Sequence, residues 1–158
     1  MNDVISPEIS EKVYRLVGSL SSNLHPLLIL AGGHHVGKTI MAQTLEGRGQ
    51  GTVVNFSAFL ARFLLQNDQR AISADRVSGY ITSLEQRVVP PYIFDNIELI
   101  FLKNLHIAAI PFFQALARHA PIVVVWPTAV ANGIFNFSQP NRPDYYSFYN
   151  PDVLVINL

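Results

Sequence analysis

The segment from Gly32 to Thr39, Gly-Gly-His-His-Val-Gly-Lys-Thr, has the spacing of a phosphate-binding loop. It matches the pattern Gly-x-x-x-x-Gly-Lys-[Ser/Thr] and lies between an apolar run that favours a strand and a stretch that favours a helix. Glycines let such a loop turn successive backbone N–H groups toward phosphate oxygens, and the start of the following helix adds a positive dipole end. The sequence therefore predicts a nucleotide-binding loop made of Gly32, Gly33, His34, His35, Val36, Gly37, Lys38, Thr39 and Ile40.

Two side chains of this loop and one distant carboxylate have the chemistry that a nucleoside triphosphate requires. Lys38 is expected to neutralise the β and γ phosphates, and the Thr39 hydroxyl is a ligand for Mg²⁺, which binds mainly through phosphates and waters. The apolar run Tyr92–Phe94 ends in Asp95, where a parallel strand would deliver the acid that organises this ion. We therefore expect ATP and Mg²⁺ as ligands, with Thr39 and Asp95 as the metal-binding residues.

Hydrolysis of ATP also needs a group that orients the attacking water, and two residues compete for this role. Asn96 directly follows Asp95, at the position where many ATPases have a glutamate, and Glu98 follows two residues later. On a continuing strand, residues 96 and 98 share one face, so Glu98 could hold the water; if the chain bends, Asn96 could. Lys38, Asp95 and Glu98 are accordingly the candidate catalytic residues.

Other polar residues have weaker patterns. Thr128 follows the apolar run 122–126, where it could sense the γ-phosphate or serve as a turn hydroxyl. Arg142 could reach a neighbouring subunit's nucleotide as a catalytic arginine, with Arg118 as a rival, or could be a surface residue. His34 and His35 fit variable loop positions better than a metal site. The remaining histidines, His25, His106 and His119, have no ligand spacing.

The composition limits the class of protein. The length of 158 residues predicts a single domain over 1–158. The 11 Lys+Arg are balanced by 11 Asp+Glu, which argues against autonomous DNA binding and leaves only a weak or indirect contact with DNA. Without a signal-peptide pattern or a membrane-length apolar run, we expect a cytoplasmic protein with no membrane partner. Because 49% of residues are hydrophobic and only 14% charged, we expect part of the surface to be covered in a homo-oligomer or by another protein.

Hydrophobic periodicity predicts an α/β domain with a three-layer core, and right-handed crossover connections favour a parallel sheet in the order 5-1-4-3-2. An N-terminal helix is expected over 6–20, and an aromatic, turn-rich insert over 129–150 is expected to form a hairpin. Ser57 is the expected N-cap of one helix, Pro111 the expected first residue of another, and 96–110 is left open. The expected strands are 27–31, 52–56, a strand that follows the Pro-Pro break at 90–91 and ends at Asp95, 121–126 and 152–158. The other expected helices are 38–45, a segment from 57, 73–86 and 112–119.

Taken together, these features resemble one family. The phosphate-binding loop, the segment 94–101 with Asp-Asn-Ile-Glu, the strand 123–127 ending in Trp-Pro, and Arg-Pro-Asp-Tyr at 142–145 are similar to BrxF, the small P-loop protein of type 3 BREX phage-defence systems. The resemblance implies an AAA-like ATPase core without a C-terminal helical lid that works beside a methyltransferase and other defence proteins. By position, it makes Gly37, Lys38 and Thr39 nucleotide- and Mg²⁺-binding residues and Asp95 the Walker B acid. Thr128 departs from the small residue expected after Trp-Pro.

Three functions remain open at this point. The first is an ATPase subunit of a defence or DNA-processing assembly, in which ATP binding orders a subunit interface. The second is a nucleotide-bound scaffold without turnover, which Asn96 favours. The third is a small-molecule kinase, which fits less well because only Arg142 lies between the fourth and fifth strands, where such kinases have an arginine-bearing lid.

Overall fold

The computed structural model describes residues 5–34, 36–67, 72–84 and 88–158. Its centre is a parallel sheet in the order β2-β3-β4-β1-β7. This confirms the predicted order, with β7 as the expected fifth strand. The strands are β1 (Leu27–Ala31), β2 (Thr52–Asn55), β3 (Tyr92–Asp95), β4 (Ile122–Trp126) and β7 (Leu154–Asn157).

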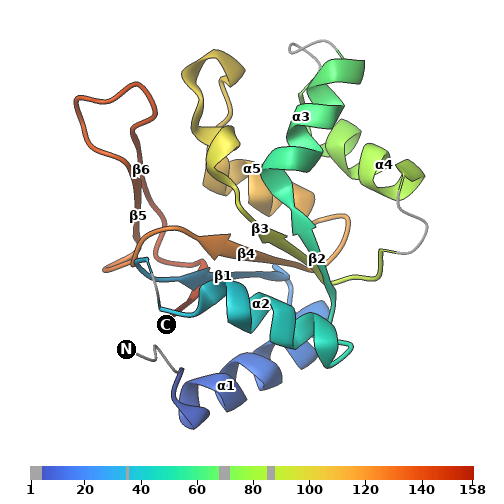
Figure 1. Ribbon diagram of the computed structural model, residues 1–158, viewed down its shortest axis with the longest axis vertical. Helices are drawn as coiled ribbons and strands as arrows, with labels where there is room; N and C mark the ends of the chain where they lie inside the picture. Colours follow the sequence, from blue (N-terminus) through green and yellow to red (C-terminus); the bar gives the residue numbers. More distant parts are fainter. Residues whose placement is uncertain (1–4, 35, 68–71, 85–87) are drawn as a thin grey trace.

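Helices cover both faces of this sheet (Figure 1). Helices α1 (Pro7–Gly18) and α2 (Lys38–Gly47) pack on one face. Helices α3 (Phe56–Gln66), α4 (Ala74–Leu84) and α5 (Ala109–Leu116) pack on the other. The architecture is therefore α/β with three layers. No helix in the described ranges is long and apolar enough to span a membrane.

The two central strands, β1 and β4, are fully buried where the predicted phosphate-binding loop begins. Every residue of β1 and β4 is buried, because helices lie above and below them and neighbouring strands lie on both sides. Continuous apolar sequence is what such a position in a parallel sheet requires. The register pairs Ala31 with Trp126, so the loops that follow these two strands start side by side.

Several predicted boundaries are confirmed. Ser6 caps α1 by accepting a hydrogen bond from the N–H of Ile9 at 3.3 Å. Ser73 accepts one from the N–H of Arg76 at the start of α4, while residues 85–86 of the expected helix lie outside the described residues.

Two predicted helix starts are wrong. Asn55, not Ser57, caps α3, because its side chain accepts from the N–H of Ala58 at 3.1 Å. Ser57 instead accepts from the N–H of Leu99 at 3.0 Å. Helix α5 begins two residues before Pro111, which therefore lies in the first turn, where its missing N–H costs no intrahelical hydrogen bond.

The segment 96–110, left open by the sequence, is neither strand nor long helix. It forms two short 3₁₀ turns, η3 (Glu98–Phe101) and η4 (Lys103–Leu105), before α5 starts. The chain turns at Asn96, which has a left-handed φ of 57°. Of the two possibilities that the sequence leaves open, a continuing strand and a bend after Asp95, the structure has the bend.

The aromatic insert forms the predicted hairpin. Strands β5 (Ile134–Phe137) and β6 (Tyr146–Tyr149) pair antiparallel and project from the carboxyl edge of the main sheet (Figure 1). Its inward side chains pack against Phe101 of η3 and Trp126 of β4. Phe101 and Phe137 stack with ring centroids 4.1 Å apart. The hairpin is thus anchored next to the loop that follows β4.

Candidate functional site

The predicted phosphate-binding loop connects β1 to α2, at the carboxyl edge of the sheet. Gly32 has a φ of 155°, and a Cβ on it would lie 2.6 Å from Val36 Cγ2 and 3.2 Å from the carbonyl oxygen of Leu158. Gly37 has a left-handed φ of 88° and is the N-cap of α2. Both positions therefore require glycine, as the loop pattern predicts. His35 lies outside the described residues.

Lys38, at the first position of α2, folds back over the loop. Its Nζ donates hydrogen bonds to the carbonyl oxygens of Gly32 and, at 3.1 Å, of Gly33. Burial lowers the pKa of Lys38 below its ordinary value, while the carboxylates of Asp95 and Glu98 act in the opposite direction. The ammonium group thus lies within the electrostatic reach of both acids.

Thr39 and Asp95 are 56 positions apart in the sequence, but their side chains are in contact. The Thr39 Oγ1 hydroxyl donates a hydrogen bond to Asp95 Oδ2 at 3.1 Å. Strand β4 separates β1 from β3 in the sheet, so it is the first turn of α2 that brings Thr39 to the carboxylate. A hydroxyl and a carboxylate oxygen are the kind of ligands that Mg²⁺ takes from a protein when phosphates and waters supply the rest. The donor set therefore fits the ion that the sequence predicts.

A pair of amide side chains lies next to Asp95. The Asn96 backbone N–H donates to Asp95 Oδ1 at 2.8 Å, and Asn96 Nδ2 donates to Asn55 Oδ1 at 3.1 Å. Asn55 ends β2, the strand that pairs with β3. Sequence reasoning missed Asn55. Its position at the carboxyl end of a strand next to the Asp95 strand is the signal that could have identified it.

Glu98 is exposed at the start of η3. Its charge acts on Lys38, as described above, so the structure brings it to the same end of the sheet as the loop. Asn96 and Glu98 both remain at this end, but they lie on a turn rather than on one face of a strand.

Thr128 touches the loop through its backbone and the hairpin through its side chain. The N–H of Gly32 donates to the Thr128 carbonyl oxygen at 3.2 Å. The Thr128 hydroxyl donates to the carbonyl oxygen of Asn136 on β5 at 2.7 Å and accepts from Trp126 Nε1 at 3.2 Å. Its hydroxyl is thus engaged in holding the hairpin.

Arg142 lies in the connection between β5 and β6, where its Nε is 3.9 Å from Asp144 Oδ1. Its side chain is exposed, and the contacts described for it stay within the hairpin connection. Arg118 lies just beyond α5, toward the amino ends of the strands, and lines a different pocket. Within the part of the chain that the structure describes, no group of three or more His, Asp or Glu side chains is arranged to hold a metal ion.

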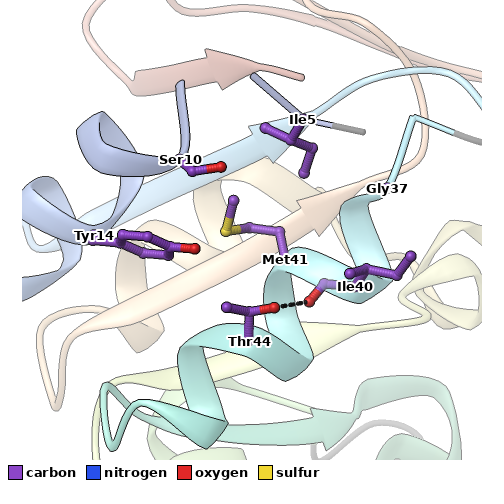
Figure 2. Close-up of a pocket in the computed structure, with 7 residues that line it drawn as sticks. All are labelled: Ile5, Ser10, Tyr14, Gly37, Ile40, Met41 and Thr44. Carbon is purple, nitrogen blue, oxygen red and sulfur yellow. Dashed lines mark hydrogen bonds between the residues drawn. The ribbon is translucent and has the colours of Figure 1, made fainter. Parts of the chain in front are cut away.

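A pocket of about 220 Å³ adjoins the loop, between α1 and α2 (Figure 2). Its walls are Ile5, Ser10, Tyr14, Gly37, Ile40, Met41 and Thr44. Of these, only Gly37 and Ile40 were expected at a ligand site. The residues from the N-terminal segment were missed, because their spacing indicates only the buried stripe of a helix.

No family model, curated protein or solved structure matches this chain.

Proposed function

We propose that this chain is a Mg²⁺-dependent, ATP-binding and ATP-hydrolysing P-loop subunit of a bacterial phage-defence assembly of the BREX type. The observation that carries the proposal is the 3.1 Å contact between Thr39 and Asp95, which joins the phosphate-binding loop to the end of β3. The glycine-dependent loop backbone and the resemblance to BrxF support the same function. The AAA-like identity of the fold is part of this proposal.

Different groups of the loop would bind different parts of the Mg²⁺-nucleotide complex. The backbone N–H groups of the loop and of the first turn of α2 would hold phosphate oxygens, and Lys38 would exchange its carbonyl contacts for phosphate contacts. Thr39 and Asp95 would hold Mg²⁺, which, when bound, supplies neutralising charge to the phosphates. Because Lys38 is partly desolvated, a phosphate is a better partner for its charge than the two carbonyls.

Hydrolysis requires a base or an orienting group for water, and Glu98 is, besides Asp95, the carboxylate whose charge acts on Lys38. Asn96 carries no basic group, but its amide, held by Asn55, could orient a water molecule. We assign Glu98 as the catalytic carboxylate. This assignment separates an ATPase from a passive binder and can be tested directly.

A scaffold that binds ATP without turnover is the second candidate. It is favoured by the amide pair of Asn55 and Asn96, which occupies the place next to Asp95 where a catalytic glutamate would lie. In that case ATP would stabilise the fold by about 2.7 kcal/mol at a concentration 100 times its dissociation constant, without release of ADP. A kinase is less well supported, because an aromatic hairpin, not an arginine-rich lid, connects β4 to β7.

The proposal places the protein in a cytoplasmic homo-oligomer or in contact with other defence proteins. The zero net charge and the exposed side chains of Leu24, Leu65 and Val89 support a surface that is partly covered. Arg142, exposed in the hairpin connection, is the candidate for reaching a neighbouring nucleotide.

The test is steady-state ADP release with Mg²⁺-ATP over a tenfold range of protein concentration. We expect Lys38→Ala and Glu98→Gln each to lower turnover by roughly 100-fold or more, because they remove phosphate neutralisation and the water-orienting group. Lys12→Ala and Glu11→Gln, which change the same charges on the exposed surface of α1, are the matched controls and should retain turnover. Turnover per subunit that rises with concentration would support a site completed between subunits.

Other outcomes contradict parts of the proposal. ATP binding without ADP release at any concentration would favour the scaffold. Turnover unchanged in Lys38→Ala would show that this loop is not the site. Loss of turnover in Lys38→Ala but not in Glu98→Gln would be consistent with the loop as the nucleotide site and would contradict a catalytic role for Glu98.

A further inference from the structure

A second pocket, of about 250 Å³, lies at the amino ends of β1 and β7, whereas the phosphate-binding loop lies at the carboxyl end of β1. A parallel strand rises about 3.3 Å per residue, so the length of β1 separates the loop from this pocket by roughly 13 Å. Three segments that are far apart in the sequence form the walls. They are the entry to β1, the end of α5 and the turn before β7.

Backbone and turn hydrogen bonds hold two of these walls in place. The N–H of Ile122 donates to the carbonyl oxygen of Pro26 at 2.9 Å, which joins the entry of β1 to the start of β4. The N–H of Asn150 donates to the carbonyl oxygen of Gly133 at 2.8 Å. The Asn150 side chain in turn accepts from the N–H of Asp152 at 3.0 Å, which fixes the turn before β7. A ligand would therefore meet walls that are already formed, and this lowers the cost of binding.

The floor of the pocket is apolar. Leu27 and Ala117 are each 4% exposed, and Val153 and Leu154 are half-buried in its wall. Leu24, which also lines the pocket, is 89% exposed and so lies at its mouth. A ligand with an aliphatic part would gain apolar contact both on the floor and with Leu24.

Two exposed side chains of opposite charge also line the pocket. Arg118 follows α5, and Asp152 lies in the turn before β7. A guanidinium group binds a carboxylate through two parallel hydrogen bonds, and a carboxylate accepts hydrogen bonds from an ammonium group. Because both charges border one small pocket, a molecule with a carboxylate and an ammonium group fits it better than a molecule with only one of them.

We infer that this pocket binds a free α-amino acid with an aliphatic side chain. The carboxylate of the ligand pairs with Arg118, its ammonium group pairs with Asp152, and its side chain covers the floor at Leu27 and Ala117. The volume of about 250 Å³ is below the roughly 300–1,000 Å³ typical of drug-sized ligands, as a molecule of this size requires. The inference is independent of the proposed function, because neither the loop nor a nucleotide takes part in it.

NMR titration of the full chain with L-leucine tests the inference, because it detects weak binding and locates it. We expect saturable shifts of backbone amides in the three wall segments. Two analogues each lack one charge: 3-methylbutylamine has no carboxylate, and 4-methylpentanoate has no amine. Each should bind at least about tenfold more weakly than L-leucine, because a charge-assisted contact is lost. Glycine should also bind at least about tenfold more weakly, because it leaves the apolar floor uncovered.

Two variants test the pairing of the charges. Arg118→Gln should weaken L-leucine at least about tenfold and leave 3-methylbutylamine within about twofold, since that analogue has no carboxylate. Asp152→Asn should weaken L-leucine to a similar extent and leave 4-methylpentanoate within about twofold. Arg15→Gln and Glu11→Gln remove the same charges from the exposed surface of α1 and are the matched controls, which should bind every ligand as wild type does. All four residues are exposed, so the variants should fold.

Several outcomes would overturn the inference without affecting the proposed function. One is a failure of L-leucine to bind, or shifts that lie away from the three wall segments. Equal affinity for L-leucine and 4-methylpentanoate would show a site for anions rather than for amino acids. Equal affinity for L-leucine and glycine would contradict the role of the apolar floor. An equal loss of affinity in Arg118→Gln and Arg15→Gln would show a response to net charge alone.

Discussion

The loops that follow β1 and β4 start side by side, but they use their polar groups differently. After β1, Gly32 to Thr39 forms a glycine-rich loop in which Lys38 is held by two backbone carbonyls. After β4, the chain forms a hairpin whose aromatic rings pack on one another and on Trp126. The loop after β1 has polar contacts near the surface that a ligand could replace. The side chains of the hairpin after β4 pack against one another and against the sheet.

If the proposed function is correct, stability and ligand binding are divided between the loops that follow these two neighbouring strands. Rings at 4.1–5.5 Å around Phe101 bury large apolar areas and stabilise the carboxyl edge of the sheet. The phosphate-binding loop can then remain open without weakening the fold. If this is correct, substitutions in the hairpin region should lower stability, and substitutions in the loop should lower ligand affinity.

The largest expected effect on stability is that of Phe101→Ala. Phe101 is 5% exposed and contacts Trp126, Phe137 and Tyr146, so its removal leaves a cavity that should cost about 3–5 kcal/mol in the free energy of unfolding. Urea denaturation measures this cost. Leu102→Ala, at a residue 44% exposed in the same segment, is the control and should cost less than half as much. A loss below about 1 kcal/mol for Phe101→Ala would contradict the view that the hairpin region carries the stability of this edge of the sheet.

The fold was predictable to the extent that it depends on continuous apolar strands and loop patterns. The apolar runs at 27–31 and 122–126 favour buried parallel strands, and right-handed crossover connections left few alternatives to the strand order that the structure has. The start of α3 was not predictable in the same way, because Asn55 and Ser57 are both good caps. Tertiary contacts decided between them, since Ser57 is engaged by the N–H of Leu99.

The candidate site was predictable where it depends on one continuous stretch of sequence, and less predictable where folding brings together residues that are far apart in the sequence. The loop pattern and the end of an apolar strand pointed to Lys38, Thr39 and Asp95 as candidates, and the structure brings Thr39 and Asp95 into contact. The Asn55 partner of Asn96 and the Tyr14 wall of the pocket depend on how separate elements pack, which no local pattern encodes. The path of the chain after Asp95 was left open by the sequence, and the left-handed φ of 57° at Asn96 decides it by redirecting the chain.

A smaller effect is expected for Tyr146→Phe, and it depends on pH. The Tyr146 hydroxyl accepts from the N–H of Ile110 in the first turn of α5 at 3.1 Å, so the variant should lose about 1.5 kcal/mol at pH 8. Tyr149→Phe, 65% exposed on the same strand, is the matched control and should change stability by less than about 0.5 kcal/mol at pH 8.

The pH dependence has a defined sign. Burial raises the pKa of Tyr146 above its ordinary value of 10.0, while the N–H of Ile110 opposes this. A raised pKa means that the unfolded state releases its proton first, so this stabilisation is complete below about pH 10 and is lost as pH rises through the folded-state pKa. Urea denaturation between pH 8 and 11 should therefore show a shrinking difference between wild type and Tyr146→Phe. A constant difference would show that Tyr146 does not contribute to the alkaline loss.

The smallest expected effect is that of Thr128→Val, which tests the boundary between the two regions. The variant keeps the shape of the side chain and the backbone carbonyl that accepts from Gly32, but it loses the hydroxyl contact to Asn136. We expect a loss of about 1 kcal/mol in the free energy of unfolding and turnover within about threefold of wild type. Parallel measurement of urea denaturation and ADP release checks both. If stability is unchanged and turnover falls more than tenfold, Thr128 acts on the γ-phosphate, and the loop after β4 belongs to the ligand site rather than to the packed hairpin.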